Sequence, residues 1–126
     1  MASYAQTSGT LTTNSSGYTP IPGLSLALPE GVGVIAIVIL NVPNPYATGN
    51  SNPGGNFGIT VNGALQPPVA SFTYNEVNPP STGRIPTTLV VGVQLQTTAQ
   101  TVNAVWSGVR GSTVHLDTPA TLSVLI

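Results

Sequence analysis

The chain has 126 residues, with two arginines, no lysine, three acidic residues, one histidine and no cysteine, and its net charge is −1. This composition excludes a disulfide framework and a cysteine-bound metal site, and so small a charge gives no electrostatic attraction to nucleic acid or an anionic membrane. The charged fraction of 4% compares with roughly 25% in an average soluble domain. We expect one domain, residues 1–126, that buries apolar surface between subunits. A monomer kept soluble by its many Ser, Thr, Asn and Gln residues is the alternative.

Short β-strands are expected along most of the chain. The 14 glycines and 12 prolines are spread through its length, and Val, Ile, Thr and Leu predominate between them, which favours strands. The expected strands are residues 24–28, 32–40, 57–61, 64–66, 69–74, 87–97, 101–107, 112–117 and 121–126. Eight or so strands without an internal repeat predict an all-β sandwich, barrel or jelly roll.

Some segments carry a more specific expectation. The continuous apolar run at 32–40 is typical of a strand covered on both faces, and it is too short for a transmembrane helix. Asn62-Gly63 indicates a hairpin with a primed turn, and Gly92 is a candidate β-bulge. Residues 41–56 contain five Asn, three Pro and three Gly, which argues against a regular element. Long loops are often functional, and a surface crossover between two sheets is an equally supported interpretation.

The few ionisable residues do not form a recognisable catalytic set. Glu30, Glu76 and Asp117 lie far apart in the sequence, which disfavours paired catalytic carboxylates. His115 and Asp117 are two residues apart on an expected strand, where a structural pair is favoured over part of a catalytic triad. The sequence has no nucleophile elbow, phosphate loop or dinucleotide fingerprint. We therefore expect neither an enzyme nor a metal or other cofactor.

The remaining polar residues suit a neutral ligand rich in hydroxyl groups, such as a sugar. Arginine presents several donors in a planar fork, Ser and Thr both donate and accept, and Tyr and Trp offer an apolar face. Arg84 lies in the segment N-P-P-S-T-G-R-I-P, residues 78–86, where Pro and Gly restrict the backbone. The alternative is that Arg84 pairs with Glu76 or another acid.

Several motifs resemble one family of sugar-binding proteins. They are I-P-G-L (21–24), V-I-L-N-V-P-N-P-Y-A-T-G-N (38–50), F-T-Y (72–74), S-T-G-R-I-P (81–86) and W-S-G-V-R-G-S-T-V-H-L-D (106–117). From about residue 18 to the end, the chain is similar to the N-terminal fucose-binding lectin domain of the Burkholderia superlectins. The resemblance implies a TNF-like jelly-roll protomer, a homotrimer, and metal-independent fucose sites between neighbouring protomers.

The sugar contacts of that family fall on matching positions of this chain. The residues so implied are Tyr46, Thr73, Tyr74, Ser81, Thr82, Arg84 and Arg110, together with Asn56 where the family has a tyrosine. The resemblance implies that Arg84 and Arg110 reach one pocket from adjacent protomers, and that Tyr46 or Tyr74 packs near the methyl group of fucose. Asn56 stands where the family has a tyrosine, and Pro80 stands where it has an acid. These two differences put the affinity for fucose and the choice of neighbouring sugars in question.

The resemblance also implies a setting for the protein. Its partners would be fucosylated glycans of host cell surfaces, reached by secretion or display on the bacterial surface, although the amino terminus lacks the charge and apolar core of a signal peptide. Family members continue into a calcium-dependent lectin domain, so we expect either a stand-alone lectin or an excised domain. Trp106 is expected in the core or an interface, and His115 as a satisfied strand residue. The alternative function is a structural or adhesive trimeric jelly roll with a protein partner or an altered sugar specificity.

Overall fold

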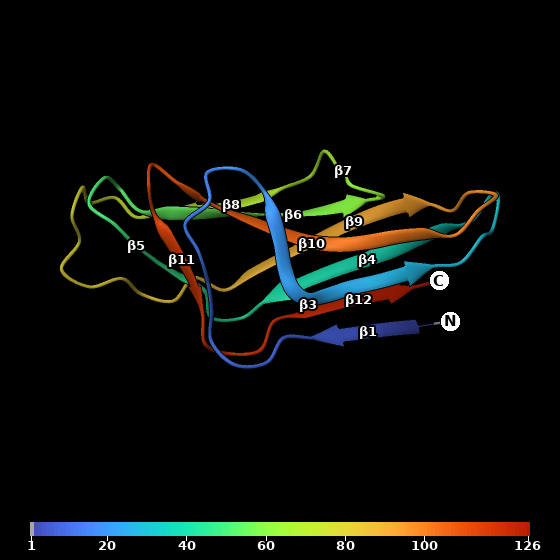
Figure 1. Cartoon of the computed structure of the whole chain (residues 1–126), viewed down its shortest axis with the longest axis horizontal. Helices are drawn as coiled ribbons and strands as arrows, with labels where there is room; N and C mark the ends of the chain where they lie inside the picture. The colour runs from blue at the N-terminus through green and yellow to red at the C-terminus, as the bar shows by residue number, and fades with distance from the viewer. Residues whose placement is uncertain (1) are drawn as a thin grey trace.

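The computed structural model describes residues 2–126, which form twelve β-strands in three antiparallel sheets (Figure 1). The strands are β1 (Ala2–Gln6), β2 (Leu11–Thr13), β3 (Thr19–Leu28), β4 (Ile35–Val42), β5 (Tyr46–Thr48), β6 (Gly54–Val61), β7 (Ala64–Leu65), β8 (Ala70–Thr73), β9 (Thr87–Gln94), β10 (Gln100–Val109), β11 (Thr113–Leu116) and β12 (Thr121–Leu125). In this part of the chain there is no helix long and apolar enough to cross a membrane.

Two larger sheets pack as a sandwich. One has the strand order β1-β12-β4-β9, and the other has the order β3-β10-β6-β7, with β8 also paired to β6. The pairs are nested in the sequence, since β1 pairs with β12, β3 with β10, β4 with β9 and β6 with β8. Nested pairs of this kind give the topology of a jelly roll. The predicted all-β jelly-roll sandwich is therefore confirmed.

Each sheet turns one face into a shared apolar core. On β4, Val38 and Leu40 are at most 1% exposed, whereas Ile35 and Ile37 on the opposite face are 62% and 38% exposed. Successive side chains of a strand point to opposite faces, and the outer face of β4 is open in the single chain. The expectation of a strand at 32–40 covered on both faces is therefore wrong for the isolated protomer.

The largest core side chains lie opposite one another on neighbouring strands. Trp106 of β10 pairs in register with Phe57 of β6, and their ring centroids are 6.5 Å apart. The two residues are 2% and 0% exposed. The prediction that Trp106 lies in the core is confirmed.

The local predictions have mixed outcomes. Asn62-Gly63 joins β6 to β7 with φ angles of 50° and 82°, as a primed two-residue turn requires, so the hairpin is confirmed. Gly92 lies in an unbroken register between β9 and β4, so the bulge expected there is wrong. The irregularity lies instead between Asn103 and Val105, where β10 shifts against β3.

Three short strands, β1, β2 and β5, lie outside the predicted ones. Because β5 and the first residues of β6 fall within 41–56, the expectation that this stretch has no regular element is wrong. Strands β2, β11 and β5 form the small third sheet, in which Tyr46 pairs with His115. This pairing with a strand distant in sequence creates β5 despite the surrounding Pro, Gly and Asn residues.

Candidate functional site

The predicted site residues gather at one end of the sandwich, where the small sheet β2-β11-β5 and the loop between β8 and β9 lie (Figure 1). The two arginines have separate sets of partners there. We call these sets the Arg110 cluster, made of Arg110, Asn52 and Thr73, and the Arg84 cluster, made of Arg84, Asp117, Asn44, Tyr46 and His115. Asn56 belongs to neither cluster but lies beside the first.

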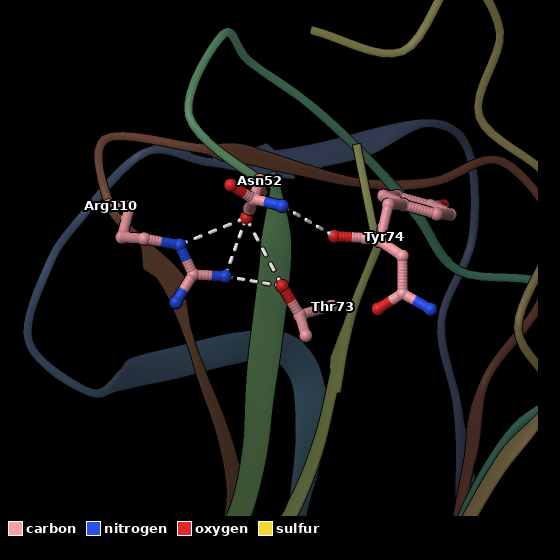
Figure 2. Close-up of a pocket in the computed structure, with 5 residues that line it drawn as sticks. Asn52, Thr73, Tyr74 and Arg110 are labelled. Carbon is pink, nitrogen blue, oxygen red and sulfur yellow. Dashed lines mark hydrogen bonds between the residues drawn. The ribbon is translucent and has the colours of Figure 1, made fainter. Parts of the chain in front are cut away.

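Arg110 closes the turn between β10 and β11 in a left-handed conformation, with a φ of 48°. Its Nε donates to the carbonyl oxygens of Ser51 and Asn52, each at 3.0 Å. Its Nη2 donates to the Asn52 carbonyl and to the hydroxyl of Thr73 (Figure 2). The Nη1 group has no hydrogen-bond partner within residues 2–126, so two of its N–H donors are available to a ligand.

An open hollow of about 330 Å³ adjoins the Arg110 cluster. Its lining residues are Asn52, Thr73, Tyr74, Asn75 and Arg110. The hollow thus combines a guanidinium, a hydroxyl, two amides and an aromatic ring, which are groups that suit a neutral polyhydroxyl ligand. Three of the predicted site residues, Thr73, Tyr74 and Arg110, are brought together here.

A glycine on β6 positions Thr73 within the Arg110 cluster. Gly54 pairs with Thr73 of β8, and a Cβ atom on Gly54 would lie 2.2 Å from the carbonyl oxygen of Phe72 and 2.9 Å from the Cα of Thr73. Such distances leave no room for any side chain. The absence of a side chain at Gly54 therefore allows β8 to approach closely enough for Thr73 to meet Arg110.

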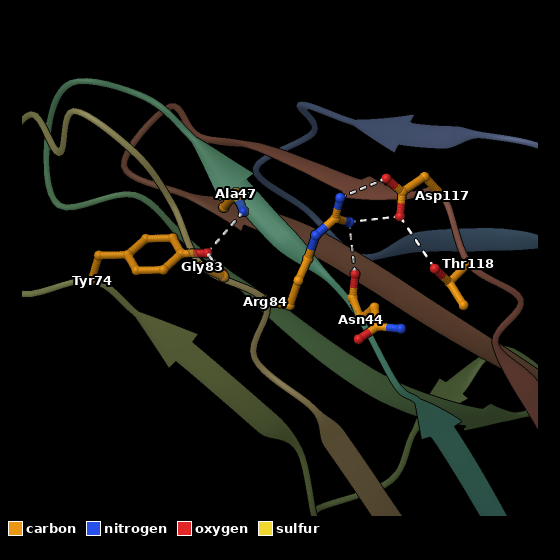
Figure 3. Close-up of polar contacts among 7 residues, drawn as sticks. All are labelled: Asn44, Ala47, Tyr74, Gly83, Arg84, Asp117 and Thr118. Carbon is orange, nitrogen blue, oxygen red and sulfur yellow. Dashed lines mark hydrogen bonds and ion pairs between the residues drawn. The ribbon is translucent and has the colours of Figure 1, made fainter.

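Arg84 is held end-on by a carboxylate (Figure 3). Its Nη1 and Nη2 donate to the two carboxylate oxygens of Asp117 at 2.6 and 2.7 Å, and Nη1 also donates to the carbonyl of Asn44 at 3.2 Å. Of the acids considered from sequence, Asp117 and not Glu76 is the partner. The Nε–H and the second Nη2–H, which share one side of the planar group, have no partner in the described chain.

Two aromatic rings support Arg84. The guanidinium lies over the ring of Tyr46, 4.2 Å from its centroid, and the rings of Tyr46 and His115 stack with centroids 4.5 Å apart. These contacts engage the Tyr46 ring within the chain. Tyr46 therefore supports Arg84, whereas Tyr74 is the tyrosine that lines the hollow.

The charge of Arg84 influences the protonation of its neighbours. Its hydrogen bond lowers the pKa of Asp117 below the usual value, against an opposing effect of desolvation. Desolvation and then the nearby Arg84 charge lower the pKa of His115, with Asp117 acting in the opposite direction. His115 is therefore neutral at pH 7, and its Nε2 is 2.9 Å from the hydroxyl of Thr48. The expected pairing of His115 with Asp117 is wrong, because each has a different partner.

The loop between β8 and β9 connects the two clusters. The hydroxyl of Tyr74 donates to the carbonyl of Gly83 at 2.6 Å and accepts from the amide of Ala47 at 3.4 Å (Figure 3). Ser81 lines a hollow of about 250 Å³ that also includes Tyr74, and Thr82 is half-buried in the same loop. The remaining lining residues are Asn75, Glu76, Pro79 and Pro80.

Five residues of the two clusters and of the hollow of about 330 Å³ are absent from the predicted set: Asn44, Asn52, Asn75, His115 and Asp117. Asn44 and Asn52 contact the arginines through backbone carbonyls, for which a sequence has no side-chain signature. Asn75 directly follows F-T-Y and could be found by extending that motif. Asp117 is one of only three acids, but its separation of 33 positions from Arg84 conceals the pairing.

The fold is a jelly-roll β-sandwich, and one end of it carries hydroxyl, amide and guanidinium groups that suit a carbohydrate ligand. The sequence model of the family "Bc2l-C, N-terminal domain" matches residues 3–125. The chain therefore belongs to this family of TNF-like lectin domains, and the resemblance noted in the sequence is confirmed. Lectins bind sugars without transforming them, so family membership also confirms that the protein is not an enzyme.

No curated protein sequence matches the chain. Among solved structures, a match is found to the CBM36-1 domain of a multidomain xylanase from the hindgut metagenome of Trinervitermes trinervoides. The TM-score is 0.48 and the sequence identity 13%, over 100% of this chain and 98% of that one. The strand topology and the family define the fold independently of this match.

Proposed function

We propose that this lectin domain binds L-fucosylated glycans at metal-independent sites between the protomers of a homotrimer. The observation that carries the proposal is that both arginines of the chain lie in polar clusters at one end and each keeps N–H donors without a partner in the described residues. Both belong to the motifs, S-T-G-R and V-R-G-S, that resemble the family's sugar contacts.

The open side of Arg84 suits a pair of adjacent sugar hydroxyls. Asp117 and Asn44 engage the end of the guanidinium, while the Nε–H and one Nη2–H remain parallel on its side. Parallel donors match two neighbouring acceptors. Because the carboxylate and the Tyr46 ring already fix the guanidinium plane, less side-chain freedom is lost when the sugar binds.

The hollow beside Arg110 would supply the second half of the site. Its Nη1 would donate to sugar oxygens, and the ring of Tyr74 would pack against C–H groups and the methyl group of fucose. Arg84 and Arg110 have separate partners within one chain, which supports a site completed by Arg84 of one protomer and Arg110 of its neighbour. Ser81 and Thr82 would add polar contacts from the connecting loop.

The outer face of the sheet β1-β12-β4-β9 supports the trimer. Its strands contain no charged residue, and in register Ile37 lies beside Leu125 and Ile39 beside Val90. Val90 and Leu125 are 53% and 47% exposed in the single chain. A contiguous exposed apolar surface of this kind marks an interface. Three sites per trimer would gain by effective concentration on a host surface rich in glycans, which a secreted or surface-displayed bacterial protein would reach.

Calorimetric titration with methyl α-L-fucoside tests the proposal, with galactose and mannose as controls and light scattering for the mass. Saturable heat with the fucoside alone and a trimeric mass are expected. Absence of heat with all three sugars would overturn the fucose assignment, and a monomeric mass would overturn a site shared between protomers.

A structural or adhesive trimer with a protein partner is the second candidate. The Arg84–Asp117 ion pair favours it, because an arginine paired in this way has a role without any ligand. This alternative predicts a trimeric mass together with no thermal shift from any monosaccharide.

A further inference from the structure

His115 is packed between the two other strands of the small sheet. It is half-buried on β11, where it pairs in register with Tyr46 of β5 on one side and with Thr12 of β2 on the other. Its imidazole is stacked on the Tyr46 ring with an angle of 8° between the planes, and its Nε2 is 2.9 Å from the hydroxyl of Thr48. These contacts hold the imidazole parallel to the Tyr46 ring.

The charged and titratable groups around His115 are the same groups that contact Arg84. The Tyr46 ring that stacks on His115 also lies 4.2 Å from the Arg84 guanidinium carbon. Asp117, two residues after His115, binds Arg84 through both carboxylate oxygens. Strand β2, on the other side of His115, consists of Leu and Thr and adds no titratable group. A change of charge on His115 therefore acts on Tyr46, Asp117 and Arg84 together.

A proton on His115 would change the forces on Arg84 in two ways. A second cation would contact the Tyr46 ring and repel the guanidinium, and it would attract the Asp117 carboxylate that orients Arg84. Imidazole titrates between about pH 5 and pH 8, and desolvation followed by the charge of Arg84 lowers the pKa of His115 within the folded chain. Fucose carries no charge, so a change in its binding at mildly acidic pH would come from the protein.

We propose that His115 is a positioning residue for Arg84 and makes sugar binding sensitive to acid: the neutral imidazole keeps Tyr46 and Arg84 in the binding arrangement, and its protonation weakens the hold on the sugar. The inference rests on the proposed function. The hydrogen bonds with Arg84 lower the pKa of Asp117 below its usual value, so this carboxylate stays charged while His115 titrates. The effect at mildly acidic pH is therefore separate from a loss of the Asp117 charge.

Calorimetric titration with methyl α-L-fucoside between about pH 7.5 and pH 5 tests the proposal. We expect the Kd of the wild type to rise roughly 2- to 5-fold over this range, as interactions between partly exposed charges would give. His115→Gln keeps a polar side chain that does not titrate, so its Kd should stay constant. The matched control is Glu30→Gln, because Glu30 is an exposed acid between β3 and β4, outside both clusters, and its removal should preserve the profile.

Proton NMR of the wild type is a second test, which holds even if His115→Gln does not fold. His115 is the one histidine of the chain, so its imidazole signal is unambiguous and its pKa can be followed with and without saturating methyl fucoside. Linkage requires the bound sugar to lower the pKa of His115 by the logarithm of the ratio of the two Kd values.

The outcomes separate this inference from the proposed function. A constant Kd in the wild type, a pKa of His115 that the sugar leaves unchanged, or a pH profile that survives His115→Gln would overturn the positioning role while fucose binding stands. No binding of methyl fucoside to the wild type at about pH 7.5, where the imidazole is neutral, would overturn the proposed function and this inference with it.

Discussion

The two arginines of this chain are held in opposite ways. Arg84, in a Pro- and Gly-bounded loop, is held by the carboxylate of Asp117, whereas Arg110, at the end of a long strand, is held by the carbonyls of Ser51 and Asn52 and the Thr73 hydroxyl. A carboxylate can be neutralised by a proton or a mutation, but a carbonyl cannot. The Arg84 cluster therefore depends on charge, and the Arg110 cluster depends on where the backbone lies.

Gly54→Ala should have the largest effect, because it disrupts the Arg110 cluster. The new Cβ would meet the Phe72 carbonyl oxygen at 2.2 Å, so β8 must move away from β6 and carry Thr73 from Arg110. We expect a loss of unfolding free energy on the order of 3 kcal/mol, measured by denaturant unfolding. Gly17→Ala is the control, because its Cβ would meet nothing within 4 Å. Equal midpoints for the two variants would contradict the steric role of Gly54.

Arg84→Ala and Arg110→Ala separate ligand binding from stability. Each should weaken methyl fucoside binding by roughly 10- to 100-fold, the usual effect of losing hydrogen bonds from a charged group. Only Arg110→Ala should lower the melting temperature, because it releases the loop at 51–52 from β8, whereas an exposed ion pair contributes little to stability. Calorimetry and thermal unfolding measure the two effects. Loss of the proposed trimer in Arg84→Ala would count against a role in ligand binding alone.

Asp117→Asn tests how far the orientation of Arg84 depends on the charge of the carboxylate. The amide keeps the shape of the carboxylate but loses its charge and one acceptor, so Arg84 is less firmly oriented. We expect about 3- to 10-fold weaker fucoside binding without loss of the fold, measured by calorimetry. Glu76→Gln is the matched control, since Glu76 is not the partner of Arg84. Tighter binding in Asp117→Asn would mean that the carboxylate competes with the sugar.

A fall in pH should destabilise the Arg84 cluster and leave the Arg110 cluster unchanged. This is the smallest of the expected effects. His115 and Asp117 both have pKa values lowered in the folded chain. Their stabilising contribution is therefore full above their unfolded pKa values, about 6.5 and 3.9, and is lost as pH falls through the lower folded values. At pH values below about 6 the melting temperature should decrease, first because His115 becomes protonated. His115→Gln should flatten the first part of that profile, and an unchanged profile would contradict this assignment.

Features set by neighbouring residues could be predicted from the sequence, and those set by distant pairing could not. Asn62-Gly63 carries its own turn conformation, so the hairpin was predictable. The strand at Tyr46–Thr48 forms because β11 pairs with it, and no local sequence pattern indicates this pairing. The apolar run at 32–40 fits a doubly covered strand, but only an assembly would provide the second cover.

The candidate site divides in the same way. The S-T-G-R and V-R-G-S motifs predict both arginines as site residues, and the structure places Thr73 and Tyr74 beside Arg110. Their contact with a sugar stays a prediction. The partner of Arg84 could not be chosen among the acids, because that choice depends on where β11 ends. Asn56 is predicted as a sugar contact only from its place in the family motif. Its hydrogen bonds to Ser71 and Ser107 become visible only when the register aligns β6 with β8 and β10.

The pairing of Ala2 with Leu125 has a practical consequence. Both chain ends emerge side by side from the end of the sandwich opposite β5 and β11 (Figure 1). A fluorophore, enzyme or particle fused to either end would be carried on the side away from the arginines. The same adjacency permits a short linker to join the ends, so that a circularly permuted chain could open in a distant hairpin and be used as a modular glycan probe.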